Sequence, residues 1–265
     1  MKKILPLFFV LLTACATGRT RKQSTSYSII SEKDEYNIGR LTAARILHKY
    51  HLYRNDRLTR YLTNMANYLA LYSKRPYIYK GYHVGILRTQ KPMAFSTPGG
   101  FIFVSRGLIK MLDTEDQLAA VIAHEIGHIE RKHGLSYIKT AYLIDLSAKL
   151  AKRFGERKIS DERKKKIAAI AVNIADVLLK RGYSRKQEEE ADNEAVKILK
   201  RSGYNPYAIV EVLEKMANLQ KKGTLQFTRT HPYPGKRAMY LKPKVRYKKP
   251  PEKRTKRFLA YKNML

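Results

Sequence analysis

Residues 124–128 read His-Glu-Ile-Gly-His, an HExxH sequence within an apolar segment of helical spacing. Residues four apart on a helix lie on the same face, one turn apart. His124 and His128 can therefore bind one metal ion, and Glu125 can reach a water molecule that the metal activates. These side chains suit zinc-dependent hydrolysis of an amide bond. Because a motif this short also arises by chance, the rest of the chain has to support it.

The pattern around the motif predicts where its helix begins and which way it faces. Thr114 precedes Gln117 by three residues, and acidic residues occupy the intervening first turn, as in a capping box. We expect an apolar face in the core and an opposite face, carrying both histidines, open to a cleft. The residues expected on the core face are Leu118, Ile122, Ile126 and Ile129.

Two histidines leave a catalytic zinc site incomplete, because such sites use a third protein ligand. The pattern HExxHxxGxxH fails here, since Arg131 replaces its glycine and His133 falls one residue too early. We expect His133 at the helix end, where it caps the last carbonyl groups or interacts favourably with the helix dipole. The acidic run 188–192 offers another ligand, unless it is only a solvated surface. Glu188 and Asp192 share one helical face, so one can bind the metal while the other orients a ligand histidine; the run itself leaves open which glutamate binds.

The N-terminus has the pattern of an export signal. Two lysines precede a short apolar run, and residues 12–15 read Leu-Thr-Ala-Cys, which resembles the lipobox of bacterial lipoproteins. This predicts a signal peptide over residues 1–15, lipidation of Cys15 and a flexible tether over residues 16–33. In such lipoproteins an Asp after the cysteine favours the inner membrane. The Ala16 of this chain therefore implies the outer membrane, facing the periplasm.

The chain is strongly basic, with 54 Lys and Arg against 22 Asp and Glu and a net charge of +32. Attraction to anionic membrane surfaces or acidic partners is one interpretation, and a general basic bias with solvated charges is another. We do not expect nucleic-acid binding, because an exported lipoprotein rarely meets nucleic acid. Since Cys15 is the only cysteine, intramolecular disulfides and Cys-ligated zinc sites are excluded.

Periodicity predicts a mostly helical α+β fold in one domain over residues 34–241. Helices are expected over two stretches of 34–72, over 142–150 and 167–179 with a charged separator at 152–166, from 185 to 203, and after 206. Strands are expected over 77–89, at Phe95 and over 101–104, the last two joined by a turn at 98–100. Segment 167–179 is either a buried helix or a hairpin that dips into a membrane. The basic tail, 242–265, is expected to lack a packed core.

Four ordered blocks resemble the gluzincin metallopeptidases of family forty-eight, which include HtpX-type and CAAX prenyl proteases. The blocks are 94–108 (Ala-Phe, then Pro-Gly-Gly-Phe-Ile-Phe-Val-Ser-Arg-Gly-Leu), 124–133, 183–192 (Tyr-Ser-Arg leading into Glu188, Ala191 and Asp192) and 230–237 (Thr-His-Pro with Arg237). The lipobox narrows the resemblance to small outer-membrane lipoproteins related to β-barrel-assembly-enhancing proteases.

The resemblance implies a zincin-like domain with one Zn²⁺ per subunit, held by His124, His128 and Glu188, with Glu125 as general base. It implies that His231 either stabilises the oxyanion or ligates zinc at rest. It also implies that the edge strand Met93-Ala94-Phe95 binds an extended substrate. The family often has Asn where this chain has Met93, so a side-chain contact from that position is lost here.

The expected function is that of a membrane-anchored zinc metalloendopeptidase acting on misfolded or misassembled envelope proteins. By resemblance, the outer-membrane assembly machinery is a further partner to test. The alternative is a non-catalytic zinc-containing chaperone or assembly factor, against which the general base Glu125 argues. An integral-membrane prenyl-type protease is disfavoured by the absence of long apolar segments.

Overall fold

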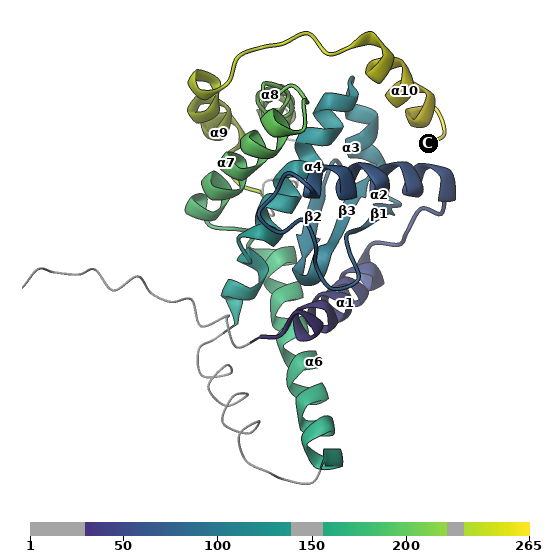
Figure 1. Cartoon of the computed structure of the whole chain (residues 1–265), viewed down its shortest axis with the longest axis vertical. Helices are drawn as coiled ribbons and strands as arrows, with labels where there is room; N and C mark the ends of the chain where they lie inside the picture. The colour runs from purple at the N-terminus through teal and green to yellow at the C-terminus, as the bar shows by residue number, and fades with distance from the viewer. Residues whose placement is uncertain (1–29, 139–155, 222–230) are drawn as a thin grey trace, which may run out of the picture.

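A small mixed sheet lies in the middle of the fold, and helices surround it (Figure 1). The computed structural model describes residues 30–138, 156–221 and 231–265. The strands are β1 (His83–Leu87), β2 (Ala94–Thr97) and β3 (Phe101–Ser105), in the order β1-β3-β2. β1 runs parallel to β3, and β2 runs antiparallel to it. The predicted α+β class, mostly helical with a small sheet, is confirmed.

β2 and β3 form a hairpin closed by the short 3₁₀ turn η2 (Pro98–Gly100), as the sequence predicted. Gly99 has a φ of 71°, which an L side chain rarely adopts. A Cβ atom there would lie 2.5 Å from the Cα of Tyr36. The turn therefore packs directly against helix α1 (Glu32–Lys49), and this close approach fixes the hairpin on that helix.

The helix of the HExxH motif, α4, is central to the packing. It contacts β2 and the helices α2, α7 and α8, which lie around it. The described helices are α1 (Glu32–Lys49), α2 (Asp56–Ala70), α3 (Arg106–Met111), α4 (Glu115–Glu130), α6 (Glu156–Lys180), α7 (Arg185–Arg201), α8 (Ala208–Lys221), α9 (Pro234–Leu241) and α10 (Glu252–Lys262), with the 3₁₀ segments η3 (His133–Tyr137) and η5 (Lys242–Lys244).

Two expected elements differ from the structure. The strand expected over 77–89 is shorter, because Lys80 and Gly81 adopt positive φ angles of 62° and 74° and make a turn before β1. The charged stretch expected to separate two helices is instead helical from Glu156, as the first part of α6. The helix expected over 142–150 lies outside the described residues.

The apolar half of α6 is a buried helix that packs against α1, while its first half extends away from the sheet (Figure 1). The side chains of Ile170, Ile174 and Leu178 are at most 4% exposed. Among the described helices, none combines the length and the apolar character that crossing a membrane requires. One face of segment 167–179 is therefore packed into the domain, as the buried-helix interpretation predicts.

The C-terminal tail packs against the domain, so the expectation that it lacks a packed core was wrong. Phe258 of α10 is 1% exposed, and the ring of Tyr261 stacks on that of Tyr61 at 4.0 Å. Arg257 forms an ion pair with Glu115, which is fully buried in the first turn of α4. Composition concealed this contact, because a helix with one apolar stripe and many lysines resembles a solvated tail.

Candidate metal centre

The motif helix α4 is buried on every side. Thr114 caps its start by accepting a hydrogen bond from the amide of Gln117, as the sequence predicted. All residues from Glu115 to Glu130 are buried, and in place of a wide open cleft Ala120, His124 and Glu125 line a small cavity between α4 and α8. His124 is 7% exposed and Glu125 is 1% exposed. Apolar periodicity does not predict the burial of this second face, because alanines, a glycine and histidines form it rather than large apolar residues.

Gly127, inside the motif, permits a close approach of the helices α4 and α7. A Cβ atom at this position would lie 2.7 Å from the backbone oxygen of Ala191, closer than atoms in contact allow. On α7, Glu188 precedes Ala191 and Asp192 follows it, so the two carboxylates flank this contact. The small residue at 127 therefore brings both carboxylates within reach of the motif histidines.

Four buried side chains converge on one point. The Nε2 atoms of His124 and His128 are 3.0 Å apart, and the Nδ1 of His231 lies 3.2 Å from the Nε2 of His124. The two carboxylate oxygens of Glu188 lie 3.5 Å from the Nε2 atoms of His124 and His128. All four ligand atoms fall within 4.8 Å of one another. Three imidazoles and one carboxylate form a donor set that suits zinc.

The outer nitrogen of His124 is held by a buried acid. Its Nδ1 lies 2.9 Å from Oδ1 of Asp192, which accepts the proton and leaves the Nε2 lone pair facing the ligand cluster. Asp192 is held in turn by Arg237 of α9, whose Nε and Nη2 donate to its oxygens at 2.8 and 2.6 Å. The same guanidinium reaches Glu188, with Nη1 2.6 Å from Oε2. Arg237 thus connects both carboxylates of α7.

His133 lies just past the end of α4, as expected, but its ring pairs with His128 and Glu190, so the expectation that it caps the last carbonyl groups was wrong. The Nδ1 atoms of the two rings are 2.9 Å apart, and the Nε2 of His133 lies 3.1 Å from a carboxylate oxygen of Glu190. A proton donated by His128 to His133, and one by His133 to Glu190, satisfies all three groups. This arrangement leaves the Nε2 lone pair of His128 directed at the cluster.

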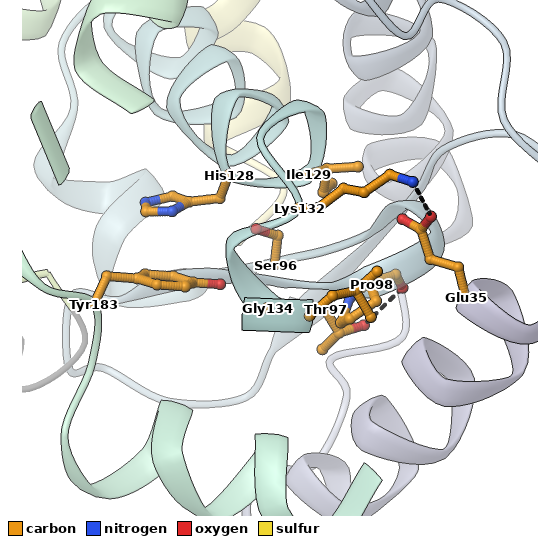
Figure 2. Close-up of a pocket in the computed structure, with 10 residues that line it drawn as sticks. Glu35, Ser96, Thr97, Pro98, His128, Ile129, Lys132, Gly134 and Tyr183 are labelled. Atoms are coloured by element: carbon orange, nitrogen blue, oxygen red, sulfur yellow. Dashed lines mark hydrogen bonds and ion pairs between the residues drawn. The ribbon is translucent and has the colours of Figure 1, made fainter. Parts of the chain in front are cut away.

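Tyr183 stacks on one face of the His128 ring, and Figure 2 shows the two rings lying nearly parallel. Their centroids are 3.8 Å apart with an angle of 16° between the planes. The phenol is 3% exposed, and burial raises its pKa well above the ordinary value. Tyr183 and His128 line a small cavity that continues between Ser96 and Lys132 (Figure 2). The imidazole of His128 is thus held by a ring stack in addition to its hydrogen bond.

His231 lies between two acids. Its Nδ1 is 3.0 Å from an oxygen of Glu188, and its Nε2 is 3.2 Å from Oε1 of Glu125. Burial by itself would lower the pKa of this imidazole, but the charges of Glu188 and Glu125 raise it to about 10. His231 therefore contacts both Glu188 of the ligand cluster and Glu125.

The charge of Arg237 keeps the two acids of the site, Glu188 and Asp192, ionised despite their burial. Burial would raise the pKa of Glu188, but Arg237, followed by His231, holds it well below its usual value. Asp192 behaves likewise, since burial opposes and Arg237 lowers its pKa. Burial, followed by the charge of His124, lowers the pKa of His128 well below its usual value. Glu188 and His128 are thus in the forms that bind metal, a deprotonated carboxylate and a neutral imidazole, whereas the neighbouring acids, against the effect of burial, raise the pKa of His124 and His231.

The residues present fit a metal ion. Besides the donor set, Oε2 of Glu125 is buried with no hydrogen-bond partner among the described residues. A buried carboxylate oxygen without a partner is costly and is expected where a water molecule or substrate completes the site. Glu125 comes from the same helix turn as His124, so its carboxylate borders the ligand cluster without being a member of it.

The structure brings together six of the residues singled out in the sequence, namely His124, Glu125, His128, Glu188, Asp192 and His231. The expected edge segment also lies nearby: β2 begins at Ala94, and Met93 continues the pairing through its backbone oxygen. Cys15 lies outside the described residues.

Three contributors escaped the sequence reasoning as functional groups: Arg237, His133 and Tyr183. Arg237 belongs to one of the blocks that resemble the family, and its burial beside two acids depends on the docking of α9. His133 carried one available signal, because a histidine five residues after His128 can fold back on it across the helix end.

Comparison with known proteins agrees with this geometry. The model of Peptidase family M48 matches residues 53–244. Mitochondrial metalloendopeptidase OMA1 of Schizosaccharomyces pombe is 31% identical over 154 residues, which cover 57% of this chain and 43% of that protein. The Beta-barrel assembly-enhancing protease of Escherichia coli is 24% identical over 227 residues, covering 79% of this chain and 43% of the relative. Metalloprotease LoiP of Escherichia coli is 25% identical over 195 residues, covering 72% of each. The chain spans less than half the length of the first two.

Proposed function

The chain belongs to Peptidase family M48 and is a metalloprotease, and we propose that it is a zinc-dependent endopeptidase with His124, His128 and Glu188 as its metal ligands. The observation that carries this proposal is the convergence of these ligand atoms beside the unpartnered carboxylate oxygen of Glu125. Asp192 and His133 orient the two ligand imidazoles.

Zinc, when bound, polarises the scissile carbonyl and makes a water molecule a stronger nucleophile at neutral pH. Glu125 accepts the proton of the attacking water and returns it to the leaving amine. β2 supports substrate placement, because in the described part of the chain it pairs with β3 alone and leaves its other edge unpaired. An extended peptide can add to that edge through backbone hydrogen bonds, which need no side chain from Met93.

His231 acts as a ligand of the resting enzyme. Its Nδ1 belongs to the cluster of ligand atoms, and its Nε2 lies against Glu125. In that position the ring occupies the space between base and ligands, so it has to move before a substrate can enter. The other role, donation to the oxyanion, needs the ring to stand away from the ligand cluster.

Two separate observations support the proposed location and the proposed substrates of the enzyme. The lipobox-like segment ending at Cys15 supports a lipid anchor in the outer membrane, facing the periplasm. A bacterial relative is named Beta-barrel assembly-enhancing protease, which supports an envelope role on misfolded or misassembled proteins. Mass spectrometry of the mature N-terminus tests the anchor, and an unlipidated Cys15 would contradict it.

The Glu125→Gln variant tests the endopeptidase activity. It keeps the metal ligands and loses the base, so we expect full zinc content by atomic absorption and loss of casein cleavage. Glu189→Gln is the matched control, because Glu189 lies on α7 outside the ligand cluster, paired with Arg185. Undiminished cleavage by Glu125→Gln would refute the mechanism. A wild-type protein with zinc and no cleavage would favour the non-catalytic chaperone.

His231→Ala tests the resting ligand in the same assay. Removal of a ligand that blocks the site raises the cleavage rate, whereas removal of an oxyanion donor lowers it by roughly two to three orders of magnitude. A lower rate with unchanged zinc content would overturn the assignment as a resting ligand.

A further inference from the structure

A group of tyrosines on the surface beside α1 has no part in the proposed mechanism. Tyr36 of α1 packs against Tyr79 and against Phe101 of β3, with ring centroids 5.4 and 5.3 Å apart. Tyr77 is 81% exposed and Tyr79 is 37% exposed, while Ile78 between them is buried. Exposed apolar residues are normally scattered singly, so rings that gather at one place indicate a binding surface. We call Tyr36, Tyr77 and Tyr79 the aromatic patch.

A strained turn holds a lysine over the aromatic patch. Lys80 has a φ of 62°, a left-handed conformation that is costly for a residue with a side chain. The turn is closed by a hydrogen bond of 2.9 Å from the amide of Gly81 to the carbonyl of Ile78. It places the Nζ of Lys80 5.3 Å from the ring centroid of Tyr36 and 5.9 Å from that of Tyr79. Strain of this kind is found at functional sites, where the surrounding structure fixes a side chain for its role.

The cations around the aromatic patch come from two elements. Lys33 and Arg40 are exposed and lie three and four residues from Tyr36, so they share its face of α1. Together with Lys80 they make three cations beside the rings. The loop that carries Lys80 belongs to the stretch 57–112, which contains no Asp or Glu. The patch therefore combines ring surface with positive charge.

The acids in the first turn of α1 do not cancel this charge. Glu35 is 2% exposed and pairs with Arg75 at 2.8 Å. The charge of Glu32, which is exposed, acts on the same arginine. Asp34 is buried and pairs with Arg163. The three acids thus have cations outside the patch as partners, and the patch keeps its positive charge.

The aromatic patch lies close to the point where the N-terminal segment enters the domain. Ser31 caps α1, and Tyr36 follows within the next two turns. The segment 16–33, predicted to be a tether, therefore leads directly to the patch. In Figure 1, α1 lies below the sheet, whereas α8 and α9, which border the metal centre, lie above it. An anchored tether thus brings the patch side of the domain toward the bilayer.

We propose that the aromatic patch, with Lys33, Arg40 and Lys80, rests on the anionic headgroups of the bilayer that holds the lipid anchor. The proposal rests on the anchor given under the proposed function and adds the side of the domain that faces lipid. Tyrosine suits the headgroup level, because its ring is apolar and its hydroxyl is polar. Lysine and arginine gain from the negative surface potential of anionic lipids.

An acidic protein is the other partner that three cations attract. Lipid is favoured, because the anchor keeps it at a high effective concentration beside the patch and weak contacts then suffice. The contact leaves the side of α8 and α9 in water, where protein substrates arrive.

Tryptophan fluorescence tests the proposal, because the chain contains no tryptophan. Tyr77→Trp places a reporter in the patch and keeps its aromatic character. Tyr247→Trp is the matched control, since Tyr247 is 59% exposed and precedes α10, which lies above the sheet in Figure 1. Each variant of the whole chain is reconstituted into vesicles of phosphatidylethanolamine and phosphatidylglycerol with brominated acyl chains, whose bromine atoms quench tryptophan at close range.

Bromine should reduce the emission of Tyr77→Trp by roughly twofold or more, relative to unbrominated vesicles, and leave Tyr247→Trp nearly unchanged. Adding Lys80→Asn to Tyr77→Trp should weaken this quenching by about twofold or more, because asparagine tolerates the left-handed turn and carries no charge. Lys248→Asn, the same change at an exposed residue outside the patch, should leave the quenching as it is. Phosphatidylcholine in place of phosphatidylglycerol should weaken the quenching as Lys80→Asn does.

Equal quenching in both tryptophan variants would overturn the proposal. No quenching in Tyr77→Trp would also overturn it, in favour of an acidic protein partner. Quenching that responds neither to Lys80→Asn nor to the loss of phosphatidylglycerol would overturn the assignment to anionic headgroups. Mass spectrometry of the same samples measures the anchor separately: an unlipidated Cys15 refutes the anchor, and the quenching still decides whether the patch binds anionic lipid.

Discussion

Replacing Arg237 by methionine tests whether the buried charges behind the ligands hold the site together. The guanidinium is 5% exposed and contacts Asp192 through two donors and Glu188 through a third. Methionine keeps much of the side-chain length and removes the charge. Both carboxylates then remain buried without the charge of Arg237.

The expected magnitude follows from this burial. Removing one partner of a buried ion pair costs about 3–5 kcal/mol, because the other charge stays desolvated and unpaired. We therefore expect the metal-free variant to lose about 3–5 kcal/mol in the free energy of unfolding. Asp192 also loses the group that positions it against His124, so zinc affinity should fall by roughly 10- to 100-fold.

The loss should depend on pH. In the wild type, the pKa values of Glu188 and Asp192 are lowered from reference values of 4.5 and 3.8. A lowered pKa in the folded state gives stability that is present above the unfolded value and lost as the pH falls through the folded value. The deficit of the variant should thus be complete above about pH 4.5 and shrink in more acidic solution.

Urea unfolding of chelator-treated protein, followed by circular dichroism from pH 7 to pH 3.5, measures both effects. Competition with a chromophoric chelator measures zinc affinity. Arg185→Met is the control, because Arg185 pairs with Glu189 at the surface, with side chains 67% and 35% exposed. It should cost less than about 1 kcal/mol. A loss below about 1 kcal/mol in Arg237→Met, or a deficit that grows on acidification, would refute the electrostatic reasoning.

Three further perturbations test the packing around the site. Gly127→Ala should push α7 away and lower zinc affinity at least tenfold in a chelator competition, whereas Gly235→Ala, whose added Cβ would lie 3.6 Å from its nearest neighbour, should not. His133→Phe should keep the ring packing but weaken zinc binding by roughly 10- to 100-fold, since His128 loses its hydrogen-bond partner; unchanged affinity would contradict that role. Deleting residues 251–265 should lower the urea midpoint and reduce the free energy of unfolding by about 1–3 kcal/mol, because buried acids at the start of α4 lose their arginine partners. An unchanged midpoint would show that α10 docks without stabilising the domain.

Local patterns carried the prediction of the ligands. The spacing of four between His124 and His128, and again between Glu188 and Asp192, depends only on helix geometry. The turn at 98–100 was equally predictable, because consecutive glycines after a proline mark a hairpin. In these cases a few adjacent residues contain all the information that the structure uses.

The shape and surroundings of the site depended on contacts between distant segments. Arg237, His133 and the docked α10 owe their roles to neighbours that lie up to about 140 residues away in sequence. Helical periodicity also predicted an open face for α4, whereas packing by α7 and α8 buries it.

The amino-acid sequence by itself determined the chemistry of this protein: a pair of histidines with an acid between them, and an acidic pair one turn apart to complete the site. Only the tertiary structure decided which groups orient those ligands and which cation keeps the acids charged. The physical reason is that ligand spacing follows from the regular geometry of one helix. Burial, charge pairing and cavity shape depend on how separate helices pack, and local sequence does not specify that packing.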